Sequence, residues 1–342
     1  MDATATMLPQ DVRIVAVVGC TKNAGKTTTL NALLARLCDA SMNPGTMSIG
    51  IDGEEADFWL GVPKPSIEVR AGSWVATAEA ALAAGTAGIE VVERVGGRTL
   101  LGDLIVGQVR TSGSVLLAGI RTKEDVRSAS AAMLRLGACR ILVDGAYQRI
   151  VAADPEVSDG VVVATGAILG TTVQEVAART RQFLQRLQLH ATVLAGDLDL
   201  MESARRAGRP AVRPDDASTP PCVVDLLESP EAIDVLGGGD AVVAFPGAVT
   251  DDLVNRCMAS ATGSLRVVAL DPTRIFLSPS VASVFSRRHQ LKVVRAIRLL
   301  CVTVNPFSVL GWTLPRVELL DAVQEVAGDI PVIAFDVDPH PS

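Results

Sequence analysis

A short glycine-containing segment, Gly19 to Thr28, carries the residues with the clearest chemical potential. It reads GCTKNAGKTT and follows the apolar run Val12–Val18. The backbone N–H groups of such a loop, at the positive end of a helix, stabilise the charges of a polyphosphate. In this pattern Gly25 lets the backbone approach the phosphates, Lys26 reaches the β- and γ-phosphates, and the Thr27 hydroxyl binds Mg²⁺. The segment therefore predicts a site for a nucleotide and Mg²⁺.

The rest of the loop completes the predicted phosphate-binding set, which adds Lys22, Asn23, Ala24 and Thr28. The two loop side chains Lys22 and Asn23 can give a charge and a hydrogen-bond donor to the γ-phosphate, and a solvated loop lysine is the alternative. The loop departs from G-x-x-x-x-G-K-[ST] at its first glycine, where this chain has Cys20. We therefore expect a slightly atypical phosphate cradle.

A nucleotide enzyme also needs acids that hold Mg²⁺ and orient water. Asp144 ends the apolar run RILVD and is predicted to face the metal beside Thr27, with an Asp-Gly turn as the alternative. Asp52 follows the next run after the loop, and four carboxylates crowd into residues 52–57. They repel one another unless a cation or partner lies among them, and a solvated acidic loop is the alternative. We predict Asp52 and Asp144 as metal ligands and catalytic groups.

Asn305 ends a later apolar run, LLCVTVN, and precedes a proline. In parallel sheets, ligands lie beyond the carboxyl ends of the strands. An asparagine there can pair with a purine edge through its amide, and an Asn-Pro turn is the alternative. We include Asn305 among the predicted nucleotide-binding residues.

The elements that must position these residues alternate between apolar runs and segments of helical period. This pattern is typical of an α/β fold, a mostly parallel sheet covered by helices. Leu30, Leu33 and Leu37 recur at helical spacing after the loop. Thr122 is predicted to cap a second helix. The segment 89–109 has β-branched residues on both sides of a Gly-Gly pair, which predicts a hairpin and an antiparallel sheet edge.

The predicted domain organisation has three parts. Residues 1–190 form a nucleotide-binding domain, and the Pro-rich and charged composition near 205–221 predicts a linker or long loop over 191–221. Residues 222–342 have their own α/β rhythm. They either continue the first sheet or form a second small domain.

The composition excludes several classes of protein. Of the 342 residues, 49% are hydrophobic and 20% charged, as in a globular protein. The net charge of -7 argues against nucleic acid or an anionic membrane as main partner. The first apolar run is too short for a signal core or membrane span, and the six cysteines contain no C-x-x-C pair. We expect a cytoplasmic protein with reduced thiols.

Five segments together resemble a known family: TKNAGKTTTLNALL, SIGIDGEEAD, GVPKP, LVDGAYQR and VTVNPFSVLG. They look like P-loop ATPases encoded beside cobalamin-dependent lysine and ornithine aminomutases, named aminomutase reactivase subunits. The chain is also similar to the wider Mrp and dethiobiotin-synthase-like class of P-loop proteins. The resemblance implies a P-loop NTPase fold and supports roles for Lys26, Thr27, Asp52 and Asp144.

The chain departs from this class in one residue of the loop. Lys22 is one place too close to Gly25 to match the signature lysine of the deviant P-loop subgroup, which usually supports a role across a dimer interface. No D-x-H-x-x-G cobalamin motif occurs, so any cobalamin would be held by the partner. The partners implied are a cobalamin-dependent aminomutase, its companion ATPase or a second copy of this chain.

The favoured function is an ATPase whose hydrolysis drives a conformational cycle on a partner enzyme, as in reactivation of an aminomutase. Lys26 and Mg²⁺ would stabilise charge at the γ-phosphate, while Asp52 or Asp144 orients water. ATP is favoured over GTP because no N-K-x-D signal is present.

Two alternatives remain open. In the first, the chain is a ligase or kinase that binds a small acid or alcohol in a pocket between the halves, lined by Arg274, Arg295 or Arg298. In the second, it is a nucleotide-gated scaffold without meaningful catalysis. We favour the ATPase because no second set of candidate catalytic residues stands out in residues 191–342.

Overall fold

The computed structural model describes residues 8–49, 66–99, 101–145, 150–216, 219–225 and 238–335. The chain divides into two compact units. Unit 1 comprises Met1–Phe183 and Arg298–Ser342, and unit 2 comprises Leu184–Ile297. Among the described helices, none combines the length and apolar character that crossing a bilayer requires.

The elements of unit 1, in chain order, are β1 (Ile14–Gly19), α2 (Lys26–Asp39), β2 (Gly45–Ile49), β3 (Ile67–Val69), β4 (Trp74–Ala78), the 3-10 helix η1 (Glu79–Ala84), β5 (Gly88–Thr99), β6 (Gly102–Thr111), β7 (Gly113–Val115), α3 (Lys123–Arg135), β8 (Ile141–Gly145), η2 (Ile150–Ala153), β9 (Gly160–Gly166), η3 (Ala167–Leu169), most of α4 (Val173–Leu187), β17 (Leu299–Asn305), α8 (Arg316–Ala327) and β18 (Val332–Ile333).

Unit 2 begins with the end of α4 and continues with α5 (Ala195–Ala207), β10 (Ala211–Pro214), β11 (Cys222–Val223), β12 (Ala241–Phe245), β13 (Val249–Thr250), α6 (Asp251–Ser260), β14 (Leu265–Ala269), the 3-10 helix η5 (Pro272–Arg274), β15 (Ile275–Phe276), α7 (Pro279–Ser286) and β16 (Gln290–Val293).

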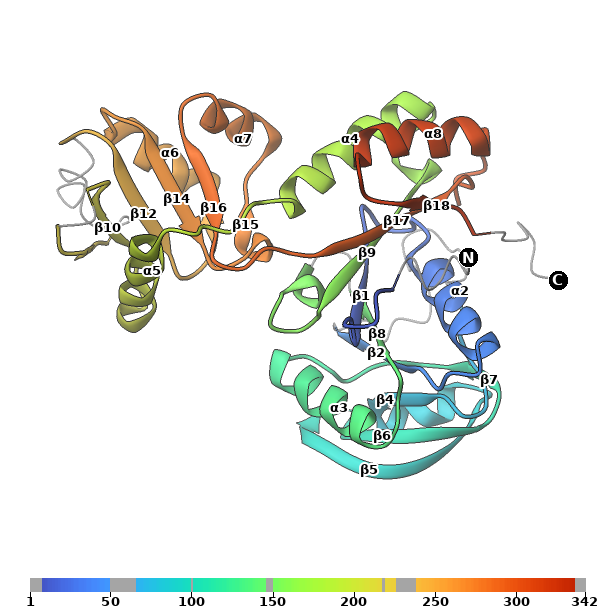
Figure 1. The fold of residues 1–342 in the computed structure, drawn as a ribbon. Coiled ribbons are helices and arrows are strands. Elements are labelled where there is room, and N and C mark those ends of the chain that lie inside the picture. Colours follow the sequence, from blue (N-terminus) through green and yellow to red (C-terminus); the bar gives the residue numbers. More distant parts are fainter. Residues whose placement is uncertain are drawn as a thin grey trace. The chain divides into compact units, whose positions relative to one another are not determined.

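A large mixed sheet organises unit 1, and the α/β prediction is confirmed (Figure 1). Its strand order is β18-β17-β9-β1-β8-β2-β4-β6-β5. All pairings from β18 to β4 are parallel, whereas β6 pairs antiparallel with β4 and β5. The predicted antiparallel edge is therefore present. The carboxyl ends of the central parallel strands meet at one edge of the sheet, where β1 leads into the glycine-containing loop.

The hairpin of β5 and β6 turns at a different place from the predicted one. Gly96 and Gly97 lie within β5, and the chain turns between Thr99 and Gly102. The pairing register shifts between Arg94 and the end of the strand, where Gly96 has a φ of 72°. Glycine in this conformation is typical of a bulge as well as of a turn. The sequence pattern did not separate the two.

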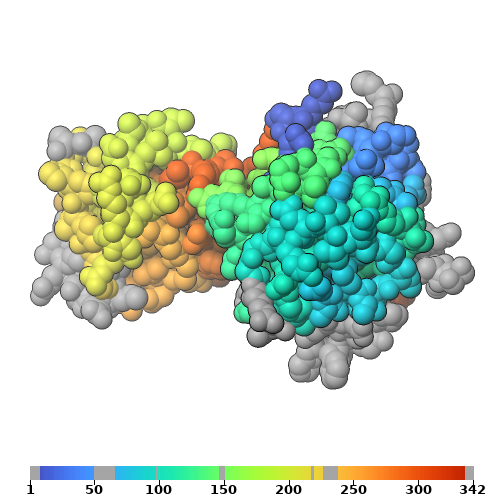
Figure 2. Space-filling view, turned by 90° about the horizontal axis from the view of Figure 1, so that it is seen from below, coloured from blue at the N-terminus to red at the C-terminus, as the bar shows by residue number. Residues whose placement is uncertain are grey.

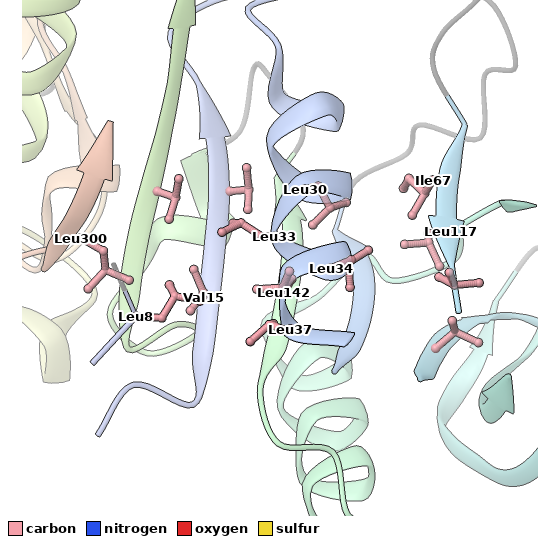
Figure 3. Packing of buried hydrophobic residues seen from close by; sticks show 14 of the residues in the cluster. Leu8, Val15, Leu30, Leu33, Leu34, Leu37, Ile67, Leu117, Leu142 and Leu300 are labelled. Atoms are coloured by element: carbon pink, nitrogen blue, oxygen red, sulfur yellow. The ribbon is translucent and has the colours of Figure 1, made fainter. Parts of the chain in front are cut away.

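Helix α2 forms because its apolar residues recur on one side after a loop that sets its start. Leu30, Leu33, Leu34 and Leu37 are buried in one core cluster with residues of β1 and β8. Figure 3 shows Leu33 on the side toward Val15, with Leu30 and Leu34 toward the segments of Ile67 and Leu117. Each buried leucine contributes roughly 2 kcal/mol of transfer free energy. This packing therefore holds α2, the helix that follows the loop, against the core.

Helix α3 lies against β5, and its predicted cap is confirmed. The Thr122 side chain accepts a hydrogen bond from Asp125 N, and Asp125 reciprocates to the Thr122 backbone in a capping box. In the space-filling view of Figure 2, the hairpin and α3 (cyan to green) lie together on one face of unit 1. The hairpin and α3 therefore lie at the β5 side of the sheet, whereas the loop follows the central strand β1.

Unit 2 has its own five-stranded sheet in the order β11-β10-β12-β14-β16. The β12–β14 and β14–β16 pairings are parallel, and β10 pairs antiparallel with β11 and β12. Leu200, Met201 and Ala204 of α5 pack on one face of this sheet. Residues of α6 and α7 share a second core with the other face. Unit 2 is thus a separate three-layer core.

The units correct the predicted boundaries 1–190, 191–221 and 222–342. Residues 191–221 include α5 and β10, so much of the predicted linker is a packed part of unit 2. Residues 298–342 return to unit 1, because β17 pairs with β9. Each of the two alternatives for residues 222–342 therefore applies to a part of them. The Pro-rich and charged composition suggested a linker. The apolar residues of α5 recur at helical spacing, however, and they pack into the core of unit 2.

Candidate functional site

The loop between β1 and α2 turns through two residues of positive φ, Asn23 at 61° and Gly25 at 92°. Helix α2 starts directly after Gly25, and its first turn contains no acidic residue. Within the loop, Ala24 is buried, while Lys22 is exposed. A helix start without its own carboxylates leaves the positive end of the helix dipole available to an external anion.

Lys26, the first residue of α2, forms an ion pair with Asp144. Its Nζ lies 3.0 Å from Asp144 Oδ1, and the side chains are 16% and 4% exposed. Lys26 Nζ also donates a hydrogen bond to the Gly145 carbonyl oxygen. The parallel register sets Asp144 beside Val17 of β1, so strand pairing brings these distant residues together. The predicted lysine and the predicted acid are therefore neighbours.

The other carboxylate oxygen of Asp144 accepts a hydrogen bond from Ser48 Oγ at 3.4 Å. Ser48 lies opposite Asp144 in the register of β2 and β8. Sequence reasoning missed Ser48, because its place beside Asp144 depends on the pairing of β2 with β8. Strands β1, β8 and β2 thus deliver the loop, the acid and its hydroxyl partner to one edge.

The threonines at the start of α2 have different surroundings. Thr27 is 8% exposed. The Thr29 hydroxyl lies 2.6 Å from the Thr303 hydroxyl of β17, which ties the first turns of α2 to that strand. Thr28 is half-buried. Thr303 was also missed, and it is recognisable as a lone hydroxyl in the buried strand β17.

Asn305 lies against Gly25 of the loop between β1 and α2. A Cβ placed on Gly25 would lie 2.9 Å from Asn305 Cβ, so the two residues are in close contact. Asn305 Oδ1 accepts a hydrogen bond of 3.0 Å from Phe307 N. The structure therefore places Asn305 with the other predicted loop residues. Its predicted contact with a purine base stays a prediction.

Cys20 occupies the position of the first consensus glycine. Its backbone N donates to Ala164 O of β9 at 2.9 Å. Desolvation raises the pKa of the Cys20 thiol to about 12, against a smaller opposing contribution from Thr165. The thiol is therefore protonated at neutral pH, and it is poorly suited to nucleophilic chemistry.

The predicted acid Asp52 and its neighbours up to residue 57 lie outside the described residues. The described part of the site consists of the loop, Lys26, Thr27, Asp144, Ser48 and Asn305. All of these belong to unit 1. Its chemistry combines two lysine amines, Lys22 and Lys26, with one buried carboxylate and several hydroxyl and amide groups.

The three arginines predicted to line a substrate pocket have different surroundings. Arg298 precedes β17, at the edge opposite Asn305, and it pairs with Asp11. Arg274 lies 3.9 Å from Asp271. Arg295 lines a cavity of about 350 Å³ within unit 2. The cavity is bounded by Leu198, Asp199, Met201, Glu202, Arg205, Leu270, Val294 and Arg295.

Comparisons with known proteins found no matching protein-family model, no matching curated protein and no matching solved structure.

Proposed function

We propose that this chain is a P-loop NTPase that binds ATP with Mg²⁺ at the loop between β1 and α2. The carrying observation is the Lys26–Asp144 pair at 3.0 Å, placed at the start of a helix whose first turn lacks acids. A lysine at a helix start beside a buried acid at a strand end supplies a cation for phosphate oxygens and a carboxylate for a metal ion. When the phosphates bind, Lys26 would exchange its contact with Asp144 for one with their oxygens.

The residues present fit Mg²⁺. Mg²⁺ prefers oxygen ligands, keeps several waters and is held by few protein groups. The Thr27 hydroxyl and the Asp144 carboxylate are such donors, and Ser48 holds the orientation of Asp144. The ion, when bound, would neutralise charge on the β- and γ-phosphate oxygens. Asp52 belongs to the proposed ligand set on the strength of the sequence.

Hydrolysis in this proposal drives a conformational cycle on a partner enzyme. Lys26 stabilises charge at the γ-phosphate, and Asp144 or Asp52 orients the attacking water. The resemblance to aminomutase reactivase subunits makes a cobalamin-dependent aminomutase the proposed partner. Its companion ATPase and a second copy of this chain are further candidates.

One observation favours a second candidate, an ATP-dependent ligase or kinase. The cavity in unit 2 is lined by two arginines, Arg205 and Arg295, and by two acids, Asp199 and Glu202, beside apolar side chains. Guanidinium groups recognise carboxylates, so a small acid is the substrate class that this cavity would take.

Phosphate release from ATP and GTP by the purified protein tests the proposal. The measurement is made alone, with a cobalamin-dependent aminomutase, and with a panel of small carboxylic acids. We expect slow release alone and stimulation by the aminomutase. Release that occurs only with a small acid would favour the ligase or kinase. Absence of nucleotide binding under all conditions would refute both.

A further inference from the structure

Asn305 sits between two glycines from different parts of unit 1. A Cβ on Gly25 would lie 2.9 Å from Asn305 Cβ and 3.2 Å from Asn305 Nδ2. A Cβ on Gly166, which pairs with Asn305 across β9 and β17, would lie 2.2 Å from the Asn305 carbonyl oxygen. Both glycines leave the space that Asn305 occupies. The carboxamide is therefore held directly at the proposed phosphate cradle.

The orientation of the carboxamide follows from its neighbour. The Phe307 N–H can only donate, so the amide atom at 3.0 Å from it is the oxygen Oδ1. The amide nitrogen then lies on the side of Gly25. Within the described part of the chain, Asn305 Nδ2 donates no hydrogen bond. A half-buried donor thus faces the loop without an acceptor among the described residues.

The segment after Asn305 is tied to the same edge of the sheet. Phe307 and Thr313 form a β-bridge, and Leu314 N donates to Pro306 O at 3.0 Å. Trp312 Nε1 donates to the carbonyl oxygens of Ala167 and Gly170, at 3.0 and 3.1 Å. Segment 306–314 is therefore a closed loop that contacts the site through Asn305 and the end of β9 through Trp312.

We propose that Asn305 is a phosphate-sensing residue, which donates from Nδ2 to a phosphate oxygen of the nucleotide while Oδ1 holds segment 306–314. This inference rests on the proposed nucleotide binding and reassigns Asn305 from the base to the phosphates. Pairing with a purine edge would use both atoms of the amide, and Oδ1 is already engaged by Phe307. The phosphate contact needs only the donor that remains.

Binding of ATP, GTP and inorganic tripolyphosphate, measured by calorimetry, separates the phosphate from the base. Asn305→Asp keeps an acceptor for Phe307 N but replaces the donor by a negative charge. We expect all three ligands to weaken by roughly the same factor, about 100-fold. Asn305→Ala adds no charge, and the loss expected for it is about 10-fold for all three. It also serves if the aspartate variant does not fold.

The matched control is Asn43→Asp, which adds the same charge at an exposed position just before β2, at the opposite edge of the sheet. We expect it to leave the three affinities unchanged. In wild-type protein, ATP should also alter the tryptophan fluorescence, and Trp312→Phe should remove that change. The fluorescence arm tests the link to segment 306–314.

The outcomes are distinguishable. If wild-type protein binds none of the three ligands, the proposed function itself fails. If it binds them and the Asn305 variants bind tripolyphosphate as tightly as wild type, this inference fails while the proposed function stands. If the Asn305 variants bind ATP more weakly but tripolyphosphate as tightly as wild type, Asn305 contacts the base and not the phosphates.

Discussion

Units 1 and 2 each contain parallel strands followed by helices, yet the starts of α2 in unit 1 and α6 in unit 2 differ in charge. The first turn of α2 in unit 1 holds no acid, and Lys26 begins the helix. The first turn of α6 in unit 2 holds Asp251 and Asp252, and Asp251 Oδ1 accepts a hydrogen bond from Ser278 N at 2.8 Å. Carboxylates at a helix start satisfy its dipole from within. The start of α2, unlike that of α6, therefore has no carboxylate of its own that would compete with an external anion.

Two buried acids, Asp197 of unit 2 and Asp144 of unit 1, differ in the same sense. In unit 2, Asp197 is fully buried, and both Arg266 and Thr192 bond to its carboxylate. Arg266 also pairs with Asp215. Among the described residues, Asp144 of unit 1 pairs with a single cation, Lys26, and has one long hydroxyl contact, with Ser48. The closed network of unit 2 suits a structural role, whereas the open pair of unit 1 can exchange partners when an anion arrives.

The largest expected effect comes from Lys26→Ala, which removes the cation from the unit 1 pair. We expect ATP affinity to fall by roughly 100-fold. Unit 1 should also lose roughly 3 kcal/mol of stability, because Asp144 is left buried without its cation. Calorimetry measures the affinity, and hydrogen exchange resolved by unit measures the stability.

Asp144→Asn is the companion variant. It should weaken ATP binding more with Mg²⁺ than without it, and Lys26→Ala combined with it should regain stability but not affinity. Unchanged ATP affinity in Lys26→Ala would remove the basis for a phosphate site. If Asp144→Asn loses ATP affinity equally with and without Mg²⁺, Asp144 is not a metal ligand and the Asp-Gly turn is the better interpretation.

An intermediate effect is expected from alanine at two glycines of positive φ. Gly25 has a φ of 92° and touches Asn305, whereas Gly208 at the end of α5 has a φ of 65° and open space around it. Gly25→Ala should cost unit 1 roughly 3 kcal/mol, from backbone strain plus the clash with Asn305. Gly208→Ala should cost unit 2 about 1 kcal/mol, from the backbone alone. Equal costs in denaturant melts would show that Asn305 does not press on the loop.

The smallest expected effect is a pH dependence of stability that is present in unit 2 and absent in unit 1. His289 Nδ1 accepts a hydrogen bond from Leu265 N at 3.0 Å, and burial, with a contribution from Arg288, lowers the pKa of His289 below 6.5. The unfolded chain therefore takes up this proton first. Stability of unit 2 should be complete above pH 6.5, fall as the pH drops through that value, and level off below the folded pKa.

The pH series is read by hydrogen exchange in each unit. His289→Asn keeps an acceptor near Leu265 N but does not titrate, so it should flatten the profile of unit 2. Unit 1 has no histidine among its described residues and should not change over this window. An unaltered slope in His289→Asn would assign the pH dependence to another group.

Much of the site was predictable because local patterns encode it. The order of strand, glycine loop and amphipathic helix predicted the loop and α2, and Thr122 predicted the start of α3. The end of RILVD predicted where Asp144 lies along its strand. These features depend on neighbours in sequence, and short-range spacing is sufficient to specify them.

Other features depended on pairing between distant segments. The return of residues 298–342 to unit 1, the hydroxyl pair of Thr29 and Thr303, and the contact of Ser48 with Asp144 follow from strand register. Composition near 205–221 suggested a linker, yet α5 and β10 lie in a packed core. Periodicity describes one segment at a time and cannot specify its partner in the sheet.

The sequence by itself determined the local chemistry of this protein: a glycine-containing loop, a lysine, a hydroxyl and an acid at a strand end. The tertiary structure decided which of these groups meet. Parallel pairing of β1 with β8 brings Asp144 to Lys26, and pairing of β9 with β17 brings Asn305 to Gly25. The physical reason is that hydrogen-bond register between strands fixes distances across more than a hundred residues of chain, which local propensity does not encode.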